Sequence, residues 1–104
     1  MTIQRDLIAR LETRRAEVAL ARGDLETART SSISAVRLAP KGFVEARAEA
    51  LLAMASLAVT EDRSAEAQSL ITEANALIAP TDYRDLRERA QRMAGLLAAR
   101  SPAR

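Results

Sequence analysis

The sequence predicts an all-α protein of five antiparallel helices, and its composition excludes the main alternatives. Of 104 residues, 48% are hydrophobic and 29% charged, whereas only 2% are aromatic. Strands favour β-branched and aromatic side chains, and disorder accompanies low hydrophobicity and a large net charge, so neither class fits. The length is that of one small domain. We expect a single helical domain over residues 1–100 and a disordered C-terminal tail at 101–104.

Helix boundaries follow from residues that end or begin helices. Proline cannot continue a helix and glycine ends one at little cost, which marks breaks at Gly23, at Pro40 with Gly42, and at Pro80. A polar stretch at 61–64 is a weaker break, with Ser64 as the expected N-cap. These four breaks predict five helices, over residues 3–22, 24–38, 42–60, 64–78 and 82–99.

The apolar pattern supports these helices in order along the chain. The first helix carries bulky residues along one side, and the second lies between the capping residue Asp24 and the breaker Pro40. In the third, Ser56 is the one polar side chain between residues 50 and 59, which predicts a helix packed on several sides. The last two helices show apolar stripes at i, i+3, i+4 and i+7 spacing. These stripes are Ala67, Leu70, Ile71, Ala74, Leu77 and Ile78, and then Tyr83, Leu86, Ala90, Met93 and Leu97.

Small residues recur at matching intervals in the two halves of the chain. The first series is Ala16, Gly23, Ala28, Ala35 and Pro40, and the second is Ala55, Asp62, Ala67, Ala74 and Pro80. Successive intervals are seven, five and seven residues in both series, and only the final interval differs. We expect these alanines at close helix contacts, and two helical hairpins with a period of 39–40 residues.

The segment from Ala21 to Pro40 resembles the turn and second helix of the tetratricopeptide repeat (TPR) family. The resemblance extends over roughly residues 9–97, as two TPR-like hairpins and a terminal helix, in a long-period form whose arginine-rich, alanine-rich composition is typical of GC-rich bacterial genomes. The chain departs from the family at Asp62, where glycine is preferred, at Ser32, where a bulky residue is usual, and in a period longer than about 34 residues.

The resemblance implies a binding scaffold whose first helices line a groove for a peptide or a partner helix. Carried over by position, the expected groove comprises Arg10, Thr13, Glu17, Leu20, Glu49, Leu52, Ser56, Val59, Asp85, Arg89 and Arg92. The chaperone-binding branch of the family clamps a carboxylate with Lys and Asn, but this chain has Thr13 and Glu17 at those places, which puts that specialised function in doubt.

The residue types argue against catalysis. The chain has no cysteine and no histidine, and its 3 glycines form no phosphate-binding loop, so we expect no enzyme, cofactor or metal. Glu17 and Glu49 could face one groove as paired carboxylates, although exposed glutamates are the ordinary finding on helices. No apolar run of membrane-spanning length is present and the N-terminus carries charges, so a cytoplasmic protein is expected.

Nucleic-acid binding is the alternative function. Arg84, Arg87, Arg89 and Arg92 could hold a phosphate backbone. However, Asp85 and Glu88 are placed for i, i+4 pairs with two of these arginines, the net charge is only +2, and aromatic platforms are lacking. The sequence therefore favours protein–protein interaction over nucleic acid.

Self-association is the remaining expectation. Helical repeats bury their apolar faces only against neighbours, and two hairpins plus one helix leave a face uncovered. We therefore predict a homodimer through the first helix or the end of the fifth, with contacts from Ile3, Leu7, Leu11, Leu96 and Leu97.

Overall fold

The fold is all-α, and the five predicted helices are confirmed. A computed structural model describes residues 2–100, with side chains described for residues 5–99. Its helices are α1 (Thr2–Ala21), α2 (Leu25–Leu38), α3 (Val44–Thr60), α4 (Ser64–Ile78) and α5 (Arg84–Arg100). Every boundary lies within two residues of the predicted one. The tail expected at 101–104 and the side chain of Ile3 lie outside the described residues.

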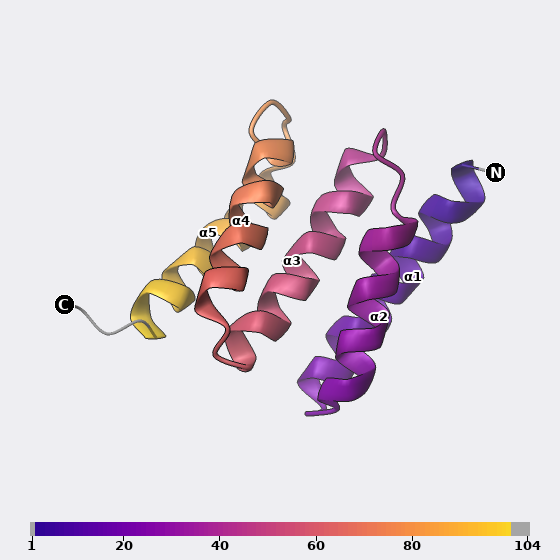
Figure 1. The fold of residues 1–104 in the computed structure, drawn as a ribbon. Coiled ribbons are helices and arrows are strands. Elements are labelled where there is room, and N and C mark those ends of the chain that lie inside the picture. The colour runs from indigo at the N-terminus through magenta and orange to yellow at the C-terminus, as the bar shows by residue number, and fades with distance from the viewer. Residues whose placement is uncertain (1, 101–104) are drawn as a thin grey trace.

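The helices form two antiparallel hairpins and a terminal helix, placed side by side (Figure 1). α1 packs on α2, and α3 packs on α4. α3 also contacts both helices of the first hairpin, and α5 contacts both helices of the second. The array measures 48 × 33 × 19 Å. As a result α1, α3 and α5 run in the same direction, with α3 between the other two.

The two hairpin turns share one backbone geometry. Gly23 ends α1 with φ of 80°, and Asp62 ends α3 with φ of 60°. In both turns the next amide reaches back to a helix carbonyl, from Asp24 to Ala19 and from Arg63 to Ala58, each at 2.8 Å. Aspartate tolerates the left-handed region better than most residues, so it can replace the glycine here. The departure at Asp62 therefore leaves the turn unchanged.

The helix starts differ between the hairpins. The Asp24 carboxylate accepts a hydrogen bond from the Thr27 amide at 3.2 Å, as a helix N-cap should. At α4, however, the N-cap is Arg63, which makes no side-chain capping bond. The expectation that Ser64 caps this helix was wrong: Ser64 is its first helical residue, so the helix begins one residue earlier than a Ser64 cap requires.

The alanines predicted at the helix crossings are buried in the core. Ala28, Ala35, Ala67 and Ala74 are all buried, as the repeated intervals predict. α3 is also buried on several sides, in keeping with its continuous apolar sequence. Small side chains at these crossings allow the helix axes to approach closely. In the core the alanines therefore allow close packing of helices, and a few leucines and isoleucines supply most of the apolar volume.

Arginines satisfy the carbonyl ends of the two second helices. Arg47 donates to the carbonyls of Val36 and Ala39, both at 3.3 Å. Forty residues later, Arg87 donates to Thr81 at 2.6 Å and Ala79 at 3.5 Å. Helix C-termini leave carbonyls without intrahelical partners, so each arginine caps the hairpin that precedes its own helix.

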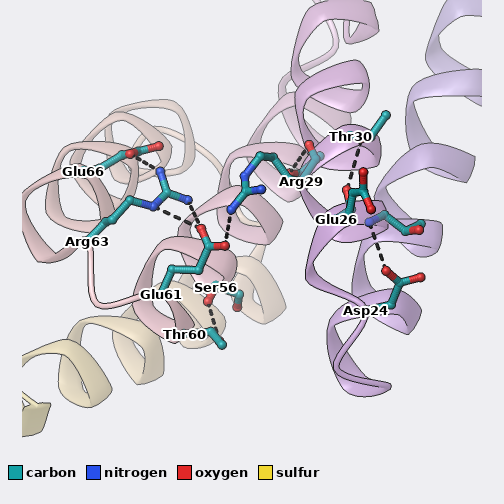
Figure 2. A network of polar contacts seen from close by, with 11 residues as sticks. Asp24, Glu26, Arg29, Thr30, Ser56, Thr60, Glu61, Arg63 and Glu66 are labelled. Atoms are coloured by element: carbon teal, nitrogen blue, oxygen red, sulfur yellow. Dashed lines mark hydrogen bonds and ion pairs between the residues drawn. The ribbon is translucent and has the colours of Figure 1, made fainter.

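A polar network joins the first hairpin to the second turn (Figure 2). Arg29 on α2 pairs with Glu61, which also accepts a hydrogen bond from Arg63 Nε at 3.1 Å. Arg63 in turn pairs with Glu66 on α4. The hydrogen bond from Arg29, assisted by that from Arg63, lowers the pKa of Glu61. The network therefore ties the two hairpins together at the end of the array where α3 finishes.

Candidate functional site

The first helices α1, α3 and α5 present one continuous hollowed face, here called the groove. One hollow of about 460 Å³ is lined by Arg14, Glu17, Leu20, Ala21, Ala53, Ser56 and Arg89. A second, of about 190 Å³, is lined by Leu20, Ser56, Val59, Thr60, Met93 and Leu96. Because Leu20 and Ser56 belong to both, the hollows form a single groove across three helices.

An ion pair bounds the groove on its charged side. Arg89 on α5 reaches Glu17 on α1, with nitrogen and oxygen 2.9 Å apart, and both side chains are about one-third exposed. The pair therefore spans from the first helix to the last across the position of α3. The i, i+4 spacing predicted that Arg89 would pair with Asp85 on its own helix. Arg89 instead pairs with Glu17 on a distant helix.

Further charges continue along the face beyond this ion pair. Arg10 lies 3.0 Å from Glu45 and 3.6 Å from Asp6, and the hydrogen bond to Glu45 raises the pKa of Arg10. Glu49 lies near both Arg10 and Arg89 but forms no ion pair among the described residues. Burial raises the pKa of Glu49, while nearby arginines oppose that shift. This part of the face is mixed in charge and largely self-neutralised.

The other half of the groove is apolar. Leu20, Val59, Met93 and Leu96 line it, and Leu96 is largely exposed although apolar. Ser56 Oγ lies 4.0 Å from Met93 Sδ, a weak contact that leaves its hydroxyl available to a ligand. The groove therefore offers an apolar floor with a charged rim, which is typical of surfaces that bind peptides or helices.

The structure brings together five of the predicted groove residues, namely Glu17, Leu20, Ser56, Val59 and Arg89. Arg10 and Glu49 lie near the same face. Thr13 and Leu52 were wrong, because both side chains are buried. They occupy equivalent positions of α1 and α3 whose side chains are buried within the array, and the Thr13 hydroxyl donates to the Ala9 carbonyl at 3.0 Å.

The two remaining groove candidates are exposed but lie elsewhere. Asp85 borders a separate hollow beside Tyr83, and Arg92 lines neither part of the groove. Both are on α5, whose contribution to the groove is Arg89, as predicted, together with Met93 and Leu96.

The residues predicted for self-association separate into different environments. Leu7 and Leu11 are exposed on the side of α1 away from α3, whereas Leu96 is exposed in the groove. Leu97 is buried in the core, so its predicted surface role was wrong: it packs against the second hairpin. Ile3 has no described side chain.

Sequence reasoning missed Arg14 and Met93 as groove residues. A shift of 40 residues aligns α3 with α5. In this alignment Ala53 is equivalent to Met93, and Ser56 is equivalent to Leu96. Ala53 and Ser56 both line the groove, so this alignment could have identified their α5 counterparts. Met93 belongs to the predicted apolar stripe of the last helix, and it both packs in the core and lines the groove.

The four clustered arginines of α5, Arg84, Arg87, Arg89 and Arg92, do not form one free basic strip. Arg87 bonds to backbone carbonyls and Arg89 pairs with Glu17, so two of the four guanidinium groups are engaged within the fold. Among the described residues no three acidic side chains gather as metal ligands. Within residues 2–100, no helix has the length and apolarity needed to cross a bilayer.

Comparison with known proteins assigns no family: no family model matches the chain, and no similar curated protein or solved structure was found.

Proposed function

We propose that this chain is a protein–protein interaction module that binds an apolar segment of another protein in the groove. The observation that carries the proposal is the continuity of the two hollows, which share Leu20 and Ser56 and extend over three helices. Such a surface fits a partner helix or an extended peptide better than a small molecule.

The apolar floor supplies most of the expected affinity. Leu96 and Met93 from α5 face Leu20 and Val59 from the other two first helices. Binding energy concentrates where a few large side chains are removed from water, so a partner would anchor leucine-sized or aromatic side chains here. The partner's anchors would then make contact with all three first helices at once.

The charged rim supplies orientation. Arg14 lines the larger hollow and forms no ion pair among the described residues, while Arg89 is already engaged by Glu17. A carboxylate on the partner would pair with Arg14 without breaking an existing contact. The segment bound would therefore combine apolar anchors with an acidic group toward the α1 side.

The resemblance to TPR proteins supports this proposal, since it implies binding along the first helices. We likewise propose that the chain performs no catalysis. Nucleic-acid binding is the weaker alternative, because two of the α5 arginines are engaged and the net charge is only +2. A steep salt dependence of any nucleic-acid affinity would favour that alternative.

Capture experiments with two matched variants test the groove. Leu96→Glu places a charge on the apolar floor, and Gln91→Glu places the same charge on an exposed site of the same helix outside both hollows. Proteins captured from the native host by the unmodified chain should be lost with Leu96→Glu and kept with Gln91→Glu. Equal capture by the two variants would contradict the proposed groove.

A further inference from the structure

The outer side of α1 exposes a stripe of large apolar side chains. Leu7, Leu11 and Val18 are 58%, 61% and 50% exposed, and Arg14 lies in line with them. Their spacings of four, three and four residues form a heptad-like seam, here called the α1 seam. It is separate from the groove, to which only Arg14 is common.

The internal repeat identifies the positions on α3 and α5 that are equivalent to the α1 seam. A shift of 39 residues from the α1 seam gives Ala46, Ala50 and Leu57 on α3, and a further 40 gives Leu86, Ala90 and Leu97 on α5. All six are at most 5% exposed, because these sides of α3 and α5 pack on the preceding hairpin. The α1 seam is therefore the equivalent helix-packing surface, open among the described residues.

The α1 seam is not built for another hairpin of the same kind. At both internal junctions an arginine, Arg47 or Arg87, caps the preceding second helix. The equivalent residue on α1 is Ile8, which has no donor to offer. Leu11 also stands where both internal junctions have a buried alanine, Ala50 on α3 and Ala90 on α5. The seam fits a single helix lying along it better than a stacked hairpin.

The charges beside the seam are almost all positive. A hollow of about 430 Å³ lies against it, with Leu11, Arg14, Arg15, Val18, Ala19, Arg22, Asp24 and Thr27 as its lining. Arg14 and Arg22 form no ion pair among the described residues, and Arg15 is 3.9 Å from Glu12. The one lining acid, Asp24, already accepts the bond from the Thr27 amide. The apolar stripe therefore has free basic groups at its edge.

We propose that the α1 seam binds an amphipathic helix of another protein whose apolar stripe is flanked by acidic residues. Apolar side chains of the partner would cover Leu7, Leu11 and Val18, and its carboxylates would pair with Arg14 and Arg22. The groove partner is also proposed to pair with Arg14, so the two surfaces share this residue, whereas Arg22 lies beside the seam alone.

A second copy of this chain fits the seam less well. Because the seam reads the same in both directions, two antiparallel copies would set each Leu7 against the other's Val18 and each Leu11 against the other's Arg14. A guanidinium group packed against a leucine loses hydration without gaining a polar partner, which opposes association. The far side of α5 in a second copy offers Glu88, Gln91 and Arg92, all exposed and polar, and cannot cover an apolar stripe.

A pair of synthetic helices provides the test. The acidic probe is a capped peptide of about 18 residues, long enough to follow α1, with leucines at heptad a and d positions and glutamates beside them. The matched probe has lysine in place of every glutamate. Fluorescence anisotropy should show binding of the acidic probe alone, weakening as salt rises.

Three substitutions then locate the binding. Leu11→Ser should weaken the acidic probe by about tenfold or more, and Arg22→Gln by several-fold, while Gln91→Ser should leave it unchanged. Circular dichroism should show the same helix content in all three, because the side chains are exposed. Equal binding of the two probes would overturn the proposal.

Two further outcomes would reassign the seam. If Leu96→Ser, and not Leu11→Ser, abolishes binding of the acidic probe, the peptide occupies the groove and the seam proposal fails. Sedimentation of the protein alone should show a monomer. A dimer that Leu11→Ser converts to monomers would show that a second copy covers the seam instead.

Discussion

The two ends of the helical array have opposite surface chemistry. On α1 the outward side carries Leu7, Leu11 and Val18, whereas on α5 the outward side carries exposed Glu88 and Gln91. Repeat arrays require a polar outer surface on a terminal helix that faces water. By that rule the outward side of α5 is suited to contact with water and that of α1 is not. The difference favours contact with a partner at the α1 end.

The same comparison can be made along one row of equivalent positions. Val18, Leu57 and Leu97 occupy the same place on α1, α3 and α5, but Val18 is half exposed and the other two are buried. The exposed member is thus distinguished by its neighbours and not by its residue type. Replacing the residues of this row by alanine, one at a time, measures how much each helix junction contributes to the free energy of unfolding.

The largest expected effect is at the junction between the hairpins. Leu57→Ala should lower the free energy of unfolding by about 2–5 kcal/mol, because the leucine is buried against Ala19 and Ala28 and its removal leaves a cavity. Val18→Ala, at the equivalent exposed position, should change it by no more than about 0.5 kcal/mol. Urea denaturation measures both, and similar losses would mean that the α1 end is covered within the monomer.

A smaller effect should follow from overfilling a helix crossing in the second hairpin. Ala74→Leu adds volume at a fully buried contact and should cost about 1–3 kcal/mol, seen as a lower Tm. Ala76→Leu is the matched control, since Ala76 is exposed on the same helix. An unchanged Tm for Ala74→Leu would contradict the repeat alignment. It would then also remove the basis for treating Val18, Leu57 and Leu97 as equivalent positions.

The fold was predictable because its determinants are local. Glycine and proline end helices through local backbone effects, as Gly23, Pro40 and Pro80 do here. The helix boundaries therefore depend little on distant contacts. The turn at Asp62 shows the limit of this reasoning. Its residue type alone indicates a departure from the repeat, and only the backbone angle shows that the turn is retained.

The groove was predictable only in part, because it depends on the rotation of each helix about its axis. α3 is apolar nearly all round, so its apolar pattern does not separate buried Leu52 from groove-lining Val59. The ion pair between Glu17 and Arg89 joins residues that are 72 positions apart, and no local pattern indicates it. Leu7 and Leu11 are exposed, as a homodimer contact requires. The homodimer itself stays a prediction. Arg14 and Arg22 now favour an acidic partner helix instead.

The smallest effect is expected midway between the ends, at Glu49, where the groove's charges from α1 and α5 meet. Burial raises the pKa of this carboxyl group despite the opposing field of Arg10 and Arg89. A carboxyl group whose pKa is higher in the folded than in the unfolded protein binds its proton more tightly when folded. Its favourable contribution is therefore present at acidic pH and is lost as pH rises through the folded pKa.

Replacing this carboxylate by an amide should consequently stabilise the protein at neutral pH. We expect Glu49→Gln to raise the free energy of unfolding at pH 7 by no more than about 1 kcal/mol, since solvent screens a half-buried group. The gain should shrink toward zero below about pH 4, where the carboxyl group is protonated in both states. Denaturation at several pH values measures this, with Glu88→Gln as the exposed control. If Glu49→Gln instead destabilises the protein at pH 7, attraction to Arg10 and Arg89 outweighs burial, and Glu49 is an electrostatic link between the two ends of the array.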